Sequence, residues 1–476
     1  MPTLPNPQRN ALWAVLFVLL VSSLALPFLL VKEPPLLDYP NHLARAFILN
    51  HLHDPAFHFS EYYRADWEPY PYILWDVLML ALQQGLPVEA AGKLLLIFNT
   101  VLLPFSVAWF LWQTNRTEIK LSFLACALCF SPLFLWGFEA FHLGMGLCFL
   151  MIGTWFWYLC KPSGPRAAFF FVLVFATYFA HLLAFASAAL ALSVFELTRF
   201  NWRNWLRLAC FLAPASLLSL WAHPGLSGHP GLGWQPFMER LRLVSDYLIH
   251  GYNRDLDLFF AGGLVLCVLV AVVGNRELRV NSRWLGVALS FLVVFLSLPH
   301  QWGENYDVNV RLLPTLYFLI FAVFRIGRRT NWIVVLGVAL TALRVFNVGT
   351  GFEREAQRNA AMDRGIEQIP RNARLFGIYE DARDVDLLDH YGHYWDYAVI
   401  RRGATTNDLF DISGQTPMRI IYDPYQDDTD NWEHISEYFD YIWCYEDTSD
   451  QGSISAIADK VYVDGPLTLY RVRKQQ

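Results

Sequence analysis

The chain has 476 residues, of which 55% are hydrophobic and 16% are charged, and its formal net charge is −6. Soluble globular proteins average about 25% charged residues, and proteins that bind nucleic acids carry clustered lysine and arginine for the phosphates. The composition therefore excludes an ordinary soluble protein and gives no reason to expect a nucleic-acid partner.

The polar residues are unevenly distributed along the chain. Up to about residue 350, long apolar runs alternate with short polar loops, and after Gly351 the chain becomes polar and acidic. This change predicts a polytopic α-helical membrane domain over residues 1–350 and a small soluble α/β domain over residues 351–476.

About eleven apolar runs are candidates to cross a bilayer, which takes about 20 residues per helix. The first is interpreted as a retained span, because its roughly 21 residues exceed the usual apolar region of a cleaved signal peptide. The predicted passes are residues 11–31, 91–112, 119–136, 139–160, 166–181, 182–198, 204–222, 256–274, 283–299, 308–325 and 331–349.

Two stretches need a separate interpretation. Residues 73–84 are apolar but short and contain Asp76, so we expect them to lie against the bundle without crossing. Residues 166–198 are few for two passes, and we expect a bent pair of helices that meet near His181.

The charged loops predict the orientation, because loops on the cytoplasmic side carry an excess of lysine and arginine. With the N-terminus inside, every inside loop is basic. The outer face then holds loops 32–90, 137–142, 223–255 and 300–307 and the whole chain after residue 350. All 13 histidines fall on or near that face. We expect an inner (plasma) membrane protein of a bacterium, with the C-terminal domain extracytoplasmic.

The soluble domain shows short apolar runs bounded by Pro, Asp or Gly, which is typical of strands. It has no glycine-rich phosphate loop, and we expect a lid or packing module. The predicted strands are Leu375–Tyr379, Tyr397–Ile400, Arg419–Tyr422, Tyr441–Tyr445 and Leu467–Val472, with helices over Phe352–Gln368 and near 432–438 and 453–459.

The seven cysteines show no metal-binding spacing. Cys126 and Cys129 form a CxxC inside an apolar run, where we interpret them as small apolar side chains. We predict no metal-ligand set, and the sequence leaves open whether a divalent cation assists.

The loop after the first span carries the strongest signal. Pro40 suits the first turn of a helix, and His42 and Arg45 then lie on the same helical face as Asp38. Asp38 has two readings, a helix N-cap and a general base at the membrane boundary. The helix is amphipathic, with an apolar stripe that can rest on the membrane, formed by Ala44, Phe47, Ile48 and Leu52.

This loop resembles the opening of the GT-C superfamily of membrane glycosyltransferases. Residues 38–46 (DYPNHLARA) are similar to its acid followed by a juxtamembrane helix, and residues 68–75 (EPYPYILW) to its aromatic return segment. The chain departs from the commonest pattern, because Tyr39 stands where a second acid is frequent and Glu68 where a lysine precedes the return segment in many members. The resemblance implies a many-pass bundle, an outer C-terminal domain and a sugar donor linked to polyprenyl phosphate.

Other polar residues on the outer face are candidates for substrate binding. Glu139 and His142 stand between two spans, and the alternative is a polar turn. His181 lies between apolar stretches, where ionisable residues are often functional, but it could be a hydrogen-bonded core histidine.

Arg311 and Trp234 complete the candidates. Arg311 begins a late span, and its guanidinium matches a donor phosphate; in the resembling family a basic residue at such a place often holds that phosphate. The alternative is an ion pair with Glu304 or Asp307. Trp234 could stack on an acceptor sugar.

We therefore expect an enzyme, an inverting membrane glycosyltransferase with Asp38 as catalytic base and an extracytoplasmic glycan, lipid or protein as acceptor. The alternatives are a flippase or transporter of lipid-linked sugars, an O-antigen-type polymerase or ligase, and a non-catalytic role in envelope assembly. The substrate-binding candidates are His42, Arg45, Glu68, Glu139, His142, His181, Trp234 and Arg311.

Overall fold

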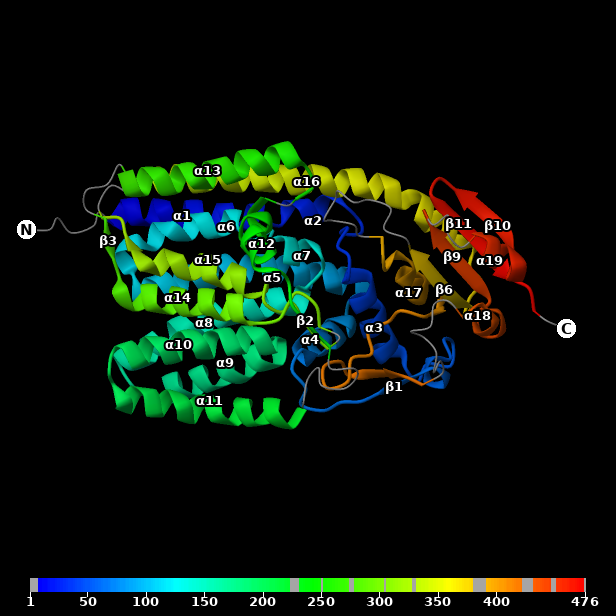
Figure 1. Ribbon diagram of the computed structural model, residues 1–476, viewed down its shortest axis with the longest axis horizontal. Coiled ribbons are helices and arrows are strands. Elements are labelled where there is room, and N and C mark those ends of the chain that lie inside the picture. The colour runs from blue at the N-terminus through cyan, green and yellow to red at the C-terminus, as the bar shows by residue number, and fades with distance from the viewer. Residues whose placement is uncertain are drawn as a thin grey trace, which may run out of the picture.

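The fold is seen in a computed structural model that describes residues 7–222, 231–249, 251–273, 278–303, 305–327, 331–379, 391–421, 431–446 and 451–474. An elongated helical bundle occupies one half of the molecule, and a small sheet with short helices caps one end of it (Figure 1). The N-terminus lies at the opposite end of the bundle from the C-terminus.

Several consecutive bundle helices are antiparallel neighbours, namely α8 with α9, α9 with α10, α10 with α11 and α14 with α15 (Figure 1). The central pair is α5 with α8, which make the most extensive contact between two helices. The bundle elements are α1 Pro7–Ser23, α2 Leu26–Leu30, α5 Val88–Thr114, η2 Arg116–Leu121, α6 Ser122–Ala127, α7 Pro132–Leu135, α8 Glu139–Cys160, α9 Gly164–Ala180, α10 Leu182–Thr198, α11 Trp202–Ala222, α13 Arg254–Val273, α14 Ser282–Ser297, α15 Leu312–Val323 and α16 Asn331–Gln368.

Each predicted pass has a helical counterpart in this bundle. Four helices of the described chain, α5, α8, α11 and α16, are long and apolar enough to cross a membrane, and most of the others are shorter apolar helices. The expected single helix over 119–136 is wrong, because the segment is broken into η2, α6 and α7. Ser131 caps the last of these, with its hydroxyl accepting from the Phe134 N–H, and Pro132 occupies the first turn, so the chain starts a new helix there.

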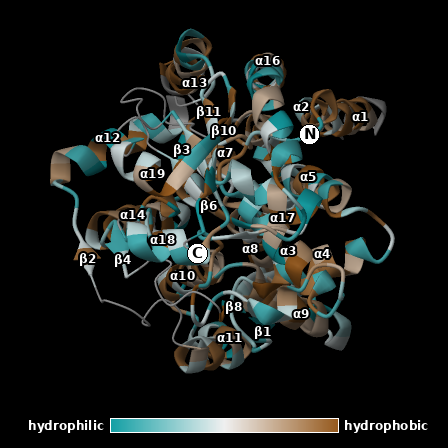
Figure 2. Ribbon diagram, turned by 90° about the vertical axis from the view of Figure 1, so that its right-hand side faces the viewer, coloured by the Kyte–Doolittle hydropathy of each residue, from teal (hydrophilic) through white to brown (hydrophobic). Residues whose placement is uncertain are grey.

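Hydrophobic side chains cover the outside of the bundle. Leu19 on α1, Leu220 on α11 and Val268 on α13 are all exposed. Seen from the sheet end, these helices lie on the perimeter and carry long hydrophobic stretches (Figure 2). An apolar perimeter is what a bilayer requires, since lipid tails replace water there.

The two ends of the bundle differ in character. Strands β3 Arg279–Val280 and β5 Phe324–Arg325 pair at the end that holds the N-terminus. The other end holds α3 Tyr39–His51, η1 Phe59–Glu61, α4 Ile73–Gln83, α12 Phe237–Ile249 and the paired strands β2 Leu232–Gly233 and β4 Gln301–Trp302. The side on which each end lies remains a prediction from the charged loops.

Two local expectations concern α4 and His181: the packing of α4 against the bundle and the break at His181 hold, and the absence of a membrane crossing at α4 stays a prediction. The short apolar segment with Asp76 is α4, which packs against α3, α5, α8 and α9. His181 separates α9 from α10: its backbone is extended and its Nδ1 accepts from the Leu183 N–H at 3.1 Å, so it is the N-cap of α10.

The apolar stripe of α3 is wrong as a membrane-facing surface. Ala44, Phe47, Ile48 and Leu52 are buried inside the protein, and Phe47 packs edge-on against Phe57 and Phe59. The loop folds back and brings its own aromatic residues to this face, so the stripe packs against protein.

The C-terminal part contains a mixed five-stranded sheet of order β10-β11-β9-β6-β7. Strand β6 is parallel to β7 and β9, and β11 is antiparallel to β9 and β10. Helix α16 runs without interruption from the bundle to this sheet, past residue 350. The elements are β6 Arg374–Tyr379, η3 Tyr394–Asp396, α17 Tyr397–Arg402, β7 Thr405–Thr406, α18 Trp432–Tyr438, β9 Tyr441–Tyr445, α19 Gln451–Ile457, β10 Ala458–Asp464 and β11 Leu467–Val472.

The structure corrects two of the expected strands. Residues 397–400 belong to helix α17, which ends at Gly403 with a φ of +68°; a C-terminal glycine of this kind and basic residues in the last turn are helix signals. Residues 418–420 form strand β8, Met418–Ile420, which pairs with β1 Tyr63–Ala65 of the segment between α3 and α4 and is not part of the main sheet.

Candidate active site

The backbone around Asp38 is fixed by the turn between α7 and α8. The Asp38 N–H donates to the carbonyl of Trp136 at 3.0 Å. Gly137 follows with a φ of +92°, and a Cβ at this position would lie 2.7 Å from the Asp38 nitrogen. Only glycine combines this conformation with so close an approach, so the turn determines where Asp38 and the start of α3 lie.

The Asp38 carboxylate makes no capping hydrogen bond to α3, although the residue stands at the N-cap position. Its side chain is 13% exposed, and its Oδ1 lies 3.7 Å from Nε2 of His393. Burial raises the pKa of Asp38 to about 6, against the opposing charges of His393 and Arg311. A carboxylate that titrates just below neutral pH is suited to accepting a proton.

Arg311 precedes α15 and has no carboxylate within ion-pair distance among the described residues; Glu304 lies outside them. Its Nη2 donates to the Tyr306 carbonyl at 3.1 Å, and its guanidinium lies over the Phe138 ring. Its charge acts on Asp38. Among the described atoms, its buried Nε has no hydrogen-bond partner, so donors remain for an anion.

Arg311 also meets His181, with 3.3 Å between Nη1 and Nε2. Because Nδ1 of His181 accepts from Leu183, the proton of a neutral ring is on Nε2. Two donors then face each other. A third group that accepts from both, such as a phosphate oxygen, would satisfy this arrangement.

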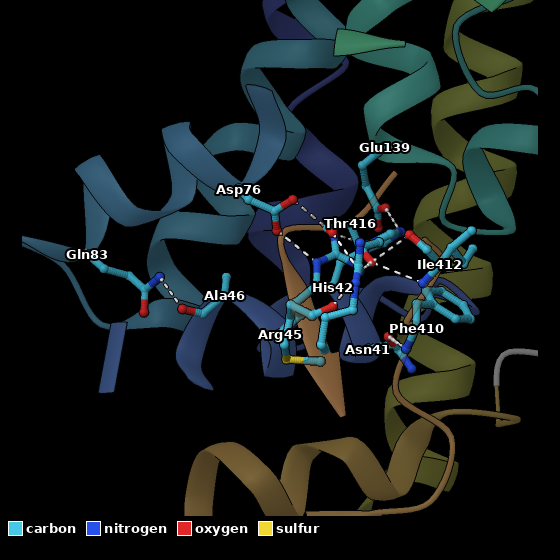
Figure 3. Close-up of polar contacts among 12 residues, drawn as sticks. Asn41, His42, Arg45, Ala46, Asp76, Gln83, Glu139, Phe410, Ile412 and Thr416 are labelled. Atoms are coloured by element: carbon cyan, nitrogen blue, oxygen red, sulfur yellow. Dashed lines mark hydrogen bonds and ion pairs between the residues drawn. The ribbon is translucent and has the colours of Figure 1, made fainter. Parts of the chain in front are cut away.

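A buried polar chain joins α4, α3 and α8 through Asp76, Arg45, His42 and Glu139 (Figure 3). Asp76 binds Arg45 through two contacts, 2.9 Å to Nε and 3.3 Å to Nη2. Nη2 of Arg45 lies 3.0 Å from Nδ1 of His42, and Nε2 of His42 lies 3.2 Å from Oε2 of Glu139. Burial and the charge of Arg45 lower the pKa of His42, so its ring is neutral, accepting from Arg45 and turning its N–H to Glu139.

Glu139 is fully buried at the start of α8. His42 lies close to one of its carboxylate oxygens, but neither oxygen makes a well-aligned hydrogen bond to the described atoms. The Glu139 carbonyl accepts from Asn99 at 3.1 Å. Glu139 therefore lies in the wall beneath α3 with acceptor capacity left over.

The C-terminal part supplies a second set of groups. Nδ1 of His393 lies 2.7 Å from Oδ2 of Asp408, and the indole N–H of Trp395 donates to the other oxygen at 2.8 Å. The Asn41 amide of α3 donates to the Asp408 carbonyl at 2.9 Å and accepts from the Phe410 N–H at 3.1 Å. The C-terminal part is thus attached to α3 directly beside Asp38.

Three predicted residues lie apart from Asp38. His142 is buried, with Nε2 3.2 Å from the Cys129 carbonyl, as in a core histidine. Glu68 is exposed on the return segment, where its carbonyl accepts from the Tyr70 N–H. Trp234 is 57% exposed and lies under the Arg240 guanidinium. No described contact joins any of them to Asp38.

One group of described residues could hold a metal ion, because ligand atoms of His393, Asp396 and Asp408 all lie within 4.8 Å of one another. Its hydrogen bonds argue against this use, since N–H groups of His393 and Trp395 already occupy both oxygens of Asp408. The arrangement suits a fixed hydrogen-bonded group better than a cation.

Sequence reasoning did not identify His393 or Asp408. Both come from the region expected to be a lid or packing module, and neither stands in a recognisable motif. The only signal was general: all histidines were placed on or near the outer face. His223 and His229 of the 223–255 loop lie outside the described residues.

No protein-family model matches the chain, and no curated protein matches it. Its structure is similar to that of ArnT from Cupriavidus metallidurans in the apo state, with a TM-score of 0.55 and 13% identical residues over 97% of this chain and 98% of that one. At this identity the likeness is one of fold. The expected architecture, a polytopic helical membrane protein with a small C-terminal sheet, is therefore confirmed.

Proposed function

We propose that the chain is a membrane glycosyltransferase that moves a sugar from a polyprenyl-phosphate donor to an acceptor hydroxyl outside the cytoplasm, with Asp38 as general base. One observation carries the proposal. A carboxylate with a pKa of about 6 and a guanidinium without a carboxylate partner among the described residues act on each other at one end of a GT-C-like bundle.

The location supports a lipid-linked donor. The distribution of basic loops favours an outer position for the Asp38 end, whereas nucleotide sugars are made in the cytoplasm. A sugar on an isoprenoid phosphate reaches the outer face by a change of leaflet, and its phosphate then lies at the depth of the head groups. Arg311, with its free donors, would hold that phosphate together with the His181 N–H.

The reaction needs one base and one positive charge. The acceptor hydroxyl gives its proton to the Asp38 carboxylate while its oxygen bonds to the anomeric carbon. The bond from that carbon to the phosphate oxygen breaks, and polyprenyl phosphate leaves with both electrons. A phosphate monoester is a weak base, so no general acid is required, and Arg311 would neutralise its charge. A single displacement inverts the anomeric centre.

The test is sugar transfer in membranes that contain the protein, with a panel of radiolabelled polyprenyl-phosphate sugars. Asp38→Asn keeps the shape and removes the base, so transfer should fall about 10²–10⁴-fold. Arg311→Gln should raise the KM for the donor. Glu433→Gln, an exposed carboxylate on α18, is the matched control and should transfer at the wild-type rate.

Three results would contradict the proposal. Equal transfer by wild type and Asp38→Asn would remove Asp38 as the base. If no donor is used but labelled lipid changes leaflet only when the protein is present, a flippase replaces the enzyme. Polymerisation of preassembled lipid-linked glycans without transfer of single sugars would indicate the O-antigen-type polymerase or ligase instead.

A further inference from the structure

His393 lies between two carboxylates that come from distant parts of the chain. Its Nδ1 is 2.7 Å from Asp408, and its Nε2 is 3.7 Å from Asp38, which is 355 positions earlier in the sequence (393 − 38). The ring therefore presents one nitrogen to a fixed partner and the other to the proposed base. Among the described residues of the C-terminal part, His393 is the one that pairs with Asp38.

The orientation of the ring is fixed from several directions. Asp408 is held by the Trp395 indole through its side chain and by Asn41 through its carbonyl. The His393 ring packs edge-on against Phe410, and Phe410 packs in the same way against His42 of α3. Rotation of His393 would break the 2.7 Å contact with Asp408 and these ring contacts together.

We propose that His393 is a positioning residue of the active site, whose imidazolium, oriented by Asp408, holds the Asp38 carboxylate in place and keeps it ionised for the acceptor proton. The C-terminal α/β part would then be a component of the catalytic site. This inference rests on the proposed function, because it assigns His393 a role toward the same base. His393 itself neither gains nor loses a proton in the transfer.

The surrounding charges support an imidazolium at this position. Burial lowers the pKa of His393, but the hydrogen bond and charge of Asp408, with the charges of Asp38 and Asp396, raise it to about 9. The ring is therefore protonated at neutral pH. Nearby His42 is neutral, because its own pKa is lowered.

Five charged groups face Asp38, and they come from α3, α8, the segment that leads into α15 and the segment before η3. The cations are His393, Arg311 at the start of α15 and Arg45 of α3, and the anions are Asp307 before α15 and Glu139 of α8. Among the cations, His393 lowers the pKa of Asp38 the most. Its removal should therefore raise that pKa further above the ordinary value than removal of any other single partner.

The pH dependence of transfer tests the inference. Asp38 is a base only when deprotonated, so kcat/KM should rise with pH through a pKa near 6 in the wild type. An opposite charge within about 4–6 Å lowers the pKa of a carboxyl by about 1–3 units. His393→Gln should therefore move the rising limb of the profile of kcat/KM against pH to higher pH by a similar amount. A one-unit shift alone lowers transfer at pH 6 about five-fold, and the deficit should narrow above pH 8.

Two further variants make the result specific. Asp408→Asn keeps the shape but weakens the charge on His393, and should shift the limb in the same direction by less. His58→Gln changes a half-exposed histidine that pairs with Glu61 and should leave the profile unchanged. Transfer should also persist in EDTA.

A deficit of His393→Gln that is equal at every pH would overturn the inference, because a purely structural role gives that result. An unchanged profile would overturn it as well. Loss of transfer in EDTA, with recovery on adding a divalent metal, would assign the cluster to a cation. Failure of the proposed function gives different results: either Asp38→Asn transfers sugar as well as the wild type, or the wild type itself transfers none.

Discussion

The ion pair between Arg45 and Asp76 allows a quantitative test of how α3 is held. Both side chains are nearly inaccessible, with 4% and 1% exposed, and two parallel contacts of 2.9 and 3.3 Å join them. Removing one partner of a buried pair costs about 3–5 kcal/mol, because the other charge stays buried without compensation. We expect Arg45→Met and Asp76→Leu each to lower the free energy of unfolding by this amount.

The double variant separates the pair from general damage. It removes both charges, so it should be more stable than the sum of the single losses predicts, with a coupling energy of about 2 kcal/mol. The measurement is SDS-induced unfolding in mixed detergent micelles. Arg64→Met is the matched control, because Arg64 is exposed on β1, and it should change stability by less than about 0.5 kcal/mol.

The ion pair also determines the orientation of His42. Arg45 donates to Nδ1 of His42 and so fixes which nitrogen faces Glu139; Arg45→Met frees that ring. The reasoning is refuted if each single variant loses as little free energy of unfolding as Arg64→Met and the double variant shows no coupling. The two charges would then be solvated and not paired in the wall beneath α3.

Three further predictions concern two glycines and the Asn41 side chain. Gly137→Ala should lower transfer about 100-fold. The new Cβ would lie 2.7 Å from the Asp38 nitrogen, and a displacement of about 1 Å at a reacting group has an effect of this size. Gly164→Ala is the control, because a Cβ at that position would have nothing within 4 Å. Asn41→Leu should cost about 1 kcal/mol per lost hydrogen bond and speed proteolysis of residues 407–416. Gly403→Ala should lower thermal stability by about 1 kcal/mol, measured by the unfolding midpoint, because its φ is +68°.

The order of the bundle helices could be predicted because hydrophobic length and loop charge are local signals. The break at His181 was also readable, since 33 residues (166–198) are few for two passes. Strands β6, β9 and β11 were expected at nearly their true positions. Strand β10 was not, because it lies at the edge of the sheet and most of its side chains are exposed or half-buried, which leaves no apolar run.

The same difference between local and long-range signals applies to the candidate site. Asp38, His42 and Arg45 lie within two helical turns, so their proximity follows from helix periodicity. Their partners do not: Asp76 is 31 residues from Arg45, and His393 is 355 residues from Asp38. Contacts over such separations depend on how the chain folds back, which single-sequence periodicity does not record.

The links between the C-terminal part and the first outer loop bear on the expected lid or packing module. Strand β8 pairs with β1, and the Arg401 guanidinium binds Glu33, Glu89 and Asp363, so it joins the loop, α5 and α16. A lid that opens would have to break these ion pairs and the strand pair together with the Asn41 hydrogen bonds. The same contacts keep His393 at a constant distance from Asp38, as a positioning charge requires. They therefore favour a fixed wall beside Asp38 over a lid that opens.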